Sequence, residues 1–160
     1  MPKDEGRSEA EHLLLFAHER EDGTPQQEVV HVEWIEDKLV RLLYSPGFVE
    51  GVAAGDVLRL LDDAGRFEVV ERGGNVAVVV FCEHAIAPLK EAIAQDVVAL
   101  GGHIDGGIER ALVATIPASA GFHAIEEVFD AWTARHPELV WMYNNVYDTA
   151  DLDRTLDWWL

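Results

Sequence analysis

The sequence predicts an α+β protein: a small N-terminal antiparallel β-sheet or barrel, followed by a ferredoxin-like β-α-β-β-α-β unit. Three observations predict this class. Before residue 73, short runs alternate hydrophobic with polar residues and are separated by turn sequences, which is typical of antiparallel strands. After it, two segments carry hydrophobic residues at three- and four-residue steps, which indicates amphipathic helices. These helices alternate with strand-like runs in the order of a split βαβ unit.

The first half is expected to consist of short antiparallel strands. Between residues 29 and 44, Val30, Val32 and Trp34 alternate with His31 and Glu33, and an acidic pair at 36–37 follows. This pattern predicts a hairpin, because side chains two apart on a strand share a face. The other strands expected here are residues 13–16, 57–61 and 66–71.

The second half begins with residues 76–81, a nearly continuous apolar run that predicts a central strand covered on both faces. Residues 86–100 have helical periodicity, with Pro88 near the start and Gly101-Gly102 beyond the end. The remaining expected elements are a hairpin of residues 103–106 and 111–116 around Gly106-Gly107, a helix over 122–132 that ends at His136-Pro137, and a strand over 139–143.

We therefore expect four parts along the chain. They are a flexible N-terminus (1–11), a small β subdomain (12–73), a ferredoxin-like subdomain (74–148) and a C-terminal helical tail (149–160). The polar composition of the first part and the Gly73-Gly74 pair after the second set these boundaries.

The charge of the chain restricts its partners. Thirty acidic residues against twelve basic ones give a formal net charge of −18, although 49% of the residues are hydrophobic. The acidic residues are spread through sequence that is patterned to bury a core, so we expect a folded protein with an anionic surface. Such a surface repels phosphate backbones and anionic lipid, which predicts no nucleic acid and no membrane partner and favours a basic protein partner.

The cysteine content and the termini predict a cytoplasmic protein. Cys82 is the only cysteine, so an intramolecular disulfide and a four-cysteine zinc site are both excluded. The first residues lack the apolar region of a signal peptide, and no run approaches the ~20 apolar residues of a membrane span. We expect no cofactor and no bound metal.

One segment, SPGFVEGVAAGDV at residues 45–57, resembles a signature of an uncharacterised bacterial family, domain of unknown function 4265. The order of the sequence elements is also similar to that of this family. A strand such as HVEW at 31–34 precedes the signature, and VVERG at 69–73 ends the strand after it. The resemblance covers about residues 28 to 145. It supports the expected fold, and it implies no catalytic residues.

We interpret this signature as a structural turn rather than a binding loop. Pro46 and the glycines favour a chain reversal between strands, with Phe48 and Val52 packed at the base of the sheet. Asp56 is then expected to accept hydrogen bonds from backbone amides in the turn. The spacing matches neither a P-loop nor a dinucleotide-binding fingerprint.

Two Cys/His/Asp pairs have the spacing of side chains that share one face of a strand. Cys82 and His84 would suit a nucleophile with its base or two metal ligands, and His103 and Asp105 have the same spacing. A lone cysteine is usually a small buried hydrophobic residue, and no second cysteine or HExxH motif accompanies it. We therefore predict that the protein is not an enzyme and has no catalytic residues.

The C-terminus combines aromatic and acidic residues. We expect a short helix with Leu152, Leu156 and Trp159 on its apolar face, packed on the sheet. The acidic side chains would then face a partner, with one aromatic residue as an anchor. The predicted partner-binding residues are Asp148, Asp151, Asp153, Asp157 and Trp158.

These features lead to three functional hypotheses. The first is an immunity protein, or antitoxin, that neutralises a basic cognate bacterial toxin by occluding its active site. The second is a small-molecule-binding sensor or regulatory protein, by analogy with other ferredoxin-like domains. The third is an enzyme that uses Cys82 and His84, which predicts an accelerated, pH-dependent reaction of that thiol with alkylating reagents.

Overall fold

The computed structural model describes residues 10–160, which form two antiparallel sheets and two α-helices. The first sheet has five strands in the order β1-β2-β3-β4-β5, so each strand pairs with the next one along the chain. Its strands are β1 (Ala10–Glu19), β2 (Pro25–Glu36), β3 (Leu39–Leu42), β4 (Val57–Leu60) and β5 (Phe67–Glu71).

The second sheet has four strands in the order β7-β8-β6-β9, and all its pairings are antiparallel. The apolar strand β6 is central, as its sequence predicts. The elements are β6 (Asn75–Cys82), α1 (Ala87–Ala99), β7 (His103–Ile108), β8 (Ala111–Pro117), the 3-10 turn η1 (Ala118–Ala120), α2 (Phe122–Arg135) and β9 (Leu139–Tyr143).

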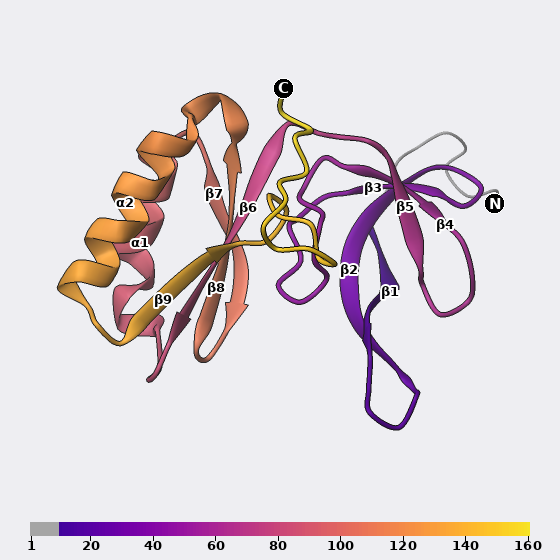
Figure 1. The fold of residues 1–160 in the computed structure, drawn as a ribbon, viewed down its shortest axis with the longest axis horizontal. Helices are drawn as coiled ribbons and strands as arrows, with labels where there is room; N and C mark the ends of the chain where they lie inside the picture. Colours follow the sequence, from indigo (N-terminus) through magenta and orange to yellow (C-terminus); the bar gives the residue numbers. More distant parts are fainter. Residues whose placement is uncertain (1–9) are drawn as a thin grey trace, which may run out of the picture.

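Figure 1 shows α1 and α2 side by side on the outer face of the second sheet, with the first sheet beyond the opposite face. Each sheet has its own hydrophobic core. One core is made of β1–β4 and the segment after β3, and the other lies between the second sheet and the two helices. The helices bury the residues that their periodicity selects: Ile93 and Val97 on α1, and Ile125, Phe129 and Trp132 on α2.

The order and type of the strands and helices agree with the sequence-based expectations from residue 13 onward, and three details differ. Of the two forms expected for the first half, the structure has the sheet and not the barrel: its strands run from β1 to β5 without pairing of these two edges. The turn of the β7–β8 hairpin lies at Glu109-Arg110, beyond the predicted Gly106-Gly107. There the carbonyls of Glu109 and Arg110 accept hydrogen bonds from Ile86 and Cys82.

The third difference concerns the C-terminal tail, which we predicted to be helical. Residues 149–160 form turns and one isolated bridge between Tyr147 and Thr155. The aspartate side chains take part in these turns: Asp148 Oδ1 accepts from Ala150 N at 2.8 Å and Asp151 Oδ1 accepts from Asp153 N at 3.1 Å. Such local bonds compete with a helix, and a helix of this length has little stability of its own.

The flexible N-terminus predicted for residues 1–11 lies almost entirely outside the described residues. Its last two residues, Ala10 and Glu11, belong to β1 and pair with Glu33 and Val32 of β2. Across residues 10–160, neither helix has the length and apolar character that a membrane crossing requires.

Candidate functional site

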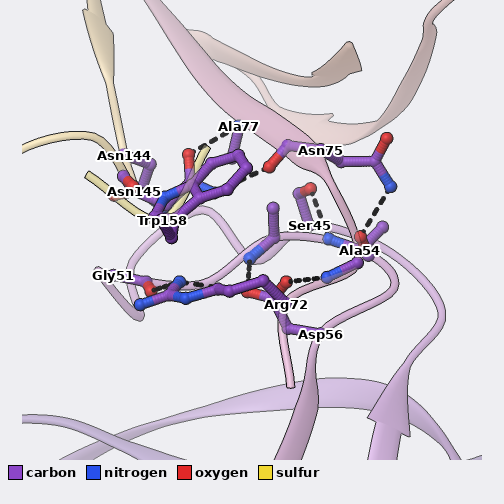
Figure 2. Close-up of polar contacts among 12 residues, drawn as sticks. Ser45, Gly51, Ala54, Asp56, Arg72, Asn75, Ala77, Asn144, Asn145 and Trp158 are labelled. Carbon is purple, nitrogen blue, oxygen red and sulfur yellow. Dashed lines mark hydrogen bonds and ion pairs between the residues drawn. The ribbon is translucent and has the colours of Figure 1, made fainter. Parts of the chain in front are cut away.

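The segment between β3 and β4, which carries the sequence signature, joins the two halves of the molecule (Figure 2). Ser45 Oγ lies 2.6 Å from Thr115 Oγ1 on β8. From the other side, the Asn144 side-chain amide donates to the carbonyls of Pro46 and Val49, each at 3.1 Å. The segment is therefore bonded to the second sheet at two places, on β8 and directly after β9.

Asp56 is the central buried charge of this joint. Its side chain is 1% exposed and accepts from Gly73 N at 2.8 Å and Ala53 N at 3.0 Å, while Arg72 Nη1 lies 3.3 Å away. Burial raises the pKa of Asp56 above its ordinary value, and the amides and Arg72 partly offset that effect. Arg72 also donates to the Gly51 carbonyl at 2.7 Å, so one ion pair ties the signature to the end of β5.

The C-terminal segment covers this joint. Trp158 Nε1 donates to the Asn145 carbonyl at 2.8 Å, and the Arg72 guanidinium lies 5.8 Å from the Trp158 ring centroid. Asn145 in turn accepts from Ala77 N and donates to the Asn75 carbonyl, both at 2.9 Å. Figure 2 shows Trp158 beside Asn144 and Asn145, with Arg72 and Asp56 below them. The network is fully bonded, which marks it as structural.

A cavity of about 520 Å³ lies beside this joint, between α2, β9 and the C-terminal segment. We call it the acidic aromatic pocket. It combines three carboxylates with three aromatic side chains, and its lining contains no lysine or arginine. The lining residues are Glu50, Glu126, Asp130, Trp141, Met142, Tyr143, Asn144, Tyr147, Thr149 and Leu152.

Helix and strand periodicity together place the pocket's polar groups. Glu126 and Asp130 lie one turn apart on α2, and Trp141 and Tyr143 lie two apart on β9, so each pair shares a face. Trp141 Nε1 donates to Asp130 Oδ1 and the Tyr143 hydroxyl donates to Glu126 Oε2, both at 2.9 Å. Burial and the Glu126 carboxylate raise the pKa of Tyr143, so its hydroxyl stays protonated and remains a donor. The rings thereby hold both carboxylates in place.

A family model described as a domain of unknown function, DUF4265, matches residues 28–141. This match covers most of the chain, including the whole signature and both helices. The chain belongs to this family. A comparison with curated proteins gave no match.

A solved structure described as a hypothetical protein from Neisseria gonorrhoeae is similar to this chain with a TM-score of 0.67. The sequences are 12% identical, and the alignment covers 85% of this chain and 94% of the other. At this identity the similarity concerns the fold alone.

In this DUF4265 member the contacts of Asp56 and Val52 agree with the structural interpretation of the signature. The expectation that Asp56 accepts backbone amides is confirmed, and Val52 is fully buried. The prediction that Phe48 plugs the sheet is wrong, because its side chain is 53% exposed; Val49 takes the buried position instead. Gly73 packs against Gly55, whose backbone atoms would lie within 2.7 Å of a Cβ at Gly73, so this contact requires glycine.

The structure separates the predicted partner-binding residues into two groups. Trp158 is packed against the core of the second half, as a docked tail requires. Asp151, Asp153 and Asp157 are exposed, and Asp148 is partly buried. Four neighbouring residues form part of the acidic aromatic pocket, and the prediction did not include them: Tyr143, Tyr147, Thr149 and Leu152.

The two Cys/His/Asp pairs differ in the structure. Cys82 is buried in the core under the helices, whereas His84 is exposed after the end of β6. His103 Nε2 and Asp105 Oδ1 do approach one another, at 2.6 Å. Within residues 10–160 there is no group of three or more His, Cys, Asp or Glu residues arranged to hold a metal ion.

We expect Cys82 to react slowly in the native protein. Cys82 is buried, so its carbamidomethylation by iodoacetamide should be at least about tenfold slower than in the urea-unfolded chain. Mass spectrometry over a time course measures both rates. A native rate that equals or exceeds the unfolded rate and rises with pH would instead favour the enzyme hypothesis for Cys82 and His84.

Trp158 is expected to stabilise the joint by packing and by its single hydrogen bond. Trp158→Phe removes the donor to the Asn145 carbonyl and should lower the free energy of unfolding by about 1 kcal/mol. Trp158→Ala also removes the packed ring and should lower it by about 3 kcal/mol. Urea unfolding measures both losses. Equal losses for the two variants would show that the ring contributes nothing.

Proposed function

We propose that this protein binds a basic protein partner by receiving a lysine or arginine side chain in the acidic aromatic pocket. One observation carries the proposal: Glu50, Glu126 and Asp130 surround a cavity walled by Trp141, Tyr143 and Tyr147. Aromatic faces and carboxylates both attract an organic cation, and the pocket contains no basic side chain to compete with it.

The charge of the whole molecule supports this choice of ligand. A net charge of −18 attracts a basic surface over a long range and accelerates its encounter. The exposed carboxylates of Asp151, Asp153 and Asp157 lie on the same C-terminal segment as the pocket residues Thr149 and Leu152. This segment would form the acidic rim of the interface, with the pocket receiving one basic anchor.

As a cellular role, we propose a cytoplasmic immunity protein that neutralises a basic cognate toxin by covering its active site. A cleft that binds nucleic acid or nucleotides is basic, so an acidic cover competes directly with the substrate. The test is co-expression with the product of the neighbouring gene, with isolation of a complex and scoring of growth. A toxic neighbour that neither forms a complex with this protein nor loses its toxicity contradicts the role.

The second candidate role is a small-molecule sensor, and a specific feature favours it. We propose that residues 74–148 are a ferredoxin-like subdomain that follows the small β subdomain of residues 12–73. The element order β6-α1-β7-β8-α2-β9 and the sheet order β7-β8-β6-β9 support this assignment, as do the two separate cores. A cleft lined by β6, β7 and β8 lies on the helix-free face of that subdomain, which gives a ligand a place to bind.

The cation preference of the pocket is testable without the partner. N-acetyl-arginine methylamide should shift the indole N–H resonance of Trp141 saturably in two-dimensional NMR spectra, since that group lines the pocket. The neutral citrulline analogue has nearly the same shape and should not. The indoles of Trp34 and Trp132, bonded to Glu11 and Asp96, serve as internal references. Equal shifts with both probes, or none with either, contradict the proposal.

A further inference from the structure

A second cavity lies in the cleft between the two halves, on the face of the second sheet that the helices leave uncovered. Its volume is about 360 Å³, which is within the range of sites for small organic molecules. It is bounded by β2 and the signature segment on one side and by β6, β7 and β8 on the other. We call it the inter-sheet cleft.

The register of the second sheet explains why the floor of the cleft is apolar. Ile108, Ala111 and Phe81 form one cross-strand row, and Gly106, Val113 and Val79 form the next. All of them line the cleft. The helices bury the opposite face of the same strands. These strands are therefore apolar on both faces, but the helices cover only the face away from the cleft. Phe81 is 37% exposed at the open end of the floor.

A buried carboxylate ends this apolar floor. Asp105 lies at a β-bulge in β7, where the pairing with β8 shifts between Ile104 and Gly106. A bulge redirects a side chain out of the regular alternation. The Asp105 side chain is 2% exposed, and its Oδ2 accepts from Ser45 N at 2.7 Å and from the Thr115 hydroxyl.

The hydrogen-bond directions around Asp105 are fixed by proton counting. The Thr115 hydroxyl has one proton, which it donates to Asp105, so the Ser45 hydroxyl must donate to Thr115. Ala54 N donates to Ser45 in turn. All of these bonds end on Oδ2. The other oxygen, Oδ1, is buried and lies 2.6 Å from His103 Nε2, so it accepts the proton on that ring nitrogen.

The polar groups of the cleft select against an anion. Glu28 and Asp105 are both in its lining, and the lining contains no lysine or arginine. Glu28 is fixed at the rim, because it accepts the amides of Gly47, Phe48 and Val49, each at 2.9 Å. An anionic ligand would meet two carboxylates on a protein of charge −18.

Aromatic side chains complete the rim and indicate a flat ligand. His31 and Tyr44 form an edge-to-face pair with centroids 5.3 Å apart, and both line the cleft with Phe48. Half-exposed rings around an apolar floor offer stacking and cation–π contacts.

We infer that the inter-sheet cleft binds a small arylalkylamine, with the aromatic ring on the Phe81–Val113 floor and the ammonium group toward Asp105 and Glu28. The apolar floor holds the ring, and the two carboxylates oppose the ammonium charge. Because the ligand bridges β2 and the second sheet, its binding would stabilise the contact between the two halves. This site shares no lining residue with the acidic aromatic pocket, so either binding proposal can be disproved without affecting the other.

The test uses three probes of one shape: 2-phenylethylamine, 2-phenylethanol and phenylacetate. Two-dimensional NMR titration of the wild-type protein, followed at the Gly106 and Gly107 amides, should give saturable binding of the amine with a Kd between about 10 μM and 1 mM. The alcohol should bind at least about tenfold more weakly, and the carboxylate should not bind. Equal affinity for amine and carboxylate, or no saturable shift with any probe, overturns the proposal.

Two variants locate the site. Asp105→Asn keeps an acceptor for Ser45 and Thr115 and removes the charge, so amine binding should weaken at least about tenfold while alcohol binding is unchanged. Phe81→Lys places a cation on the floor and should abolish amine binding. Its control is Val98→Lys, which adds the same charge at an exposed position on α1, on the other side of the sheet and outside the cleft lining. If both lysine variants weaken binding equally, the amine binds elsewhere.

Discussion

Asp56→Ala is expected to lower the free energy of unfolding by about 3 kcal/mol, a loss as large as that expected for Trp158→Ala. Removing the carboxylate leaves the amides of Ala53 and Gly73 and the Arg72 guanidinium without their buried acceptor. Because the same contacts hold the signature segment between the two sheets, the loss should extend to the whole joint. Urea unfolding followed by tryptophan fluorescence measures it.

Two further variants make this result specific. Asp56→Asn keeps one acceptor oxygen, so its free energy of unfolding should fall by less than that of the alanine variant. Asp63→Ala removes an exposed carboxylate from the β4–β5 turn and should change stability by less than about 0.5 kcal/mol. A loss at Asp56 no larger than that at Asp63 would contradict the assigned role.

The pH dependence of the Asp56 contribution has a definite sign. Burial raises the pKa of Asp56 in the folded protein, so the native state holds the proton more tightly than the unfolded chain does. Its contribution to stability is therefore greatest below the unfolded-state pKa, and it declines as the pH rises through the raised native pKa. The difference in free energy of unfolding between the wild type and Asp56→Asn should therefore be smaller at pH 7 than at pH 4. A constant difference would argue against the raised pKa.

The largest binding effect is expected from neutralising the two α2 carboxylates of the acidic aromatic pocket. In the double variant Glu126→Gln, Asp130→Asn, the amide oxygens still accept from Tyr143 and Trp141, so the pocket keeps its shape. Losing two charge-assisted contacts costs about 3 kcal/mol, which corresponds to about 100-fold weaker binding of a tri-arginine peptide. Calorimetry at physiological ionic strength measures this change.

A control of equal charge separates the pocket from the general field of the protein. Glu83→Gln, Glu91→Gln changes the net charge by the same two units at exposed positions outside the pocket lining. Since remote charges are screened at this ionic strength, the control should weaken binding by less than about threefold. If both double variants weaken peptide binding equally, the pocket has no specific role in binding.

The sequence was sufficient for most of the fold because its elements follow strict periodicities. The three- and four-residue spacing of Leu89, Ile93, Val97 and Leu100 predicted α1, and the apolar run of β6 predicted its central place in the sheet. The tail was mispredicted for a local reason. Its leucine spacing favoured a helix, but the side chains of Asp148 and Asp151 bond to backbone amides two residues later.

The sites were harder to predict because each is assembled from distant parts of the chain. The sequence marked the acidic C-terminus, yet the pocket beside it also needs Glu50 from the signature segment and Glu126 from α2. For Asp105 the sequence showed only that it lies two residues after His103. It did not predict the bulge that turns the Asp105 side chain toward Ser45.

The sequence by itself determined the mixed α+β class, the order of the elements, the family and the strongly anionic character of this protein. Each of these depends on composition or on neighbours within a few residues of one another. Only the tertiary structure decided that the signature segment joins two sheets, that Trp158 covers the joint, and that two cavities flank it. Most of these features depend on contacts between residues far apart in the sequence, such as Ser45 with Asp105 and Pro46 with Asn144, which no local pattern encodes.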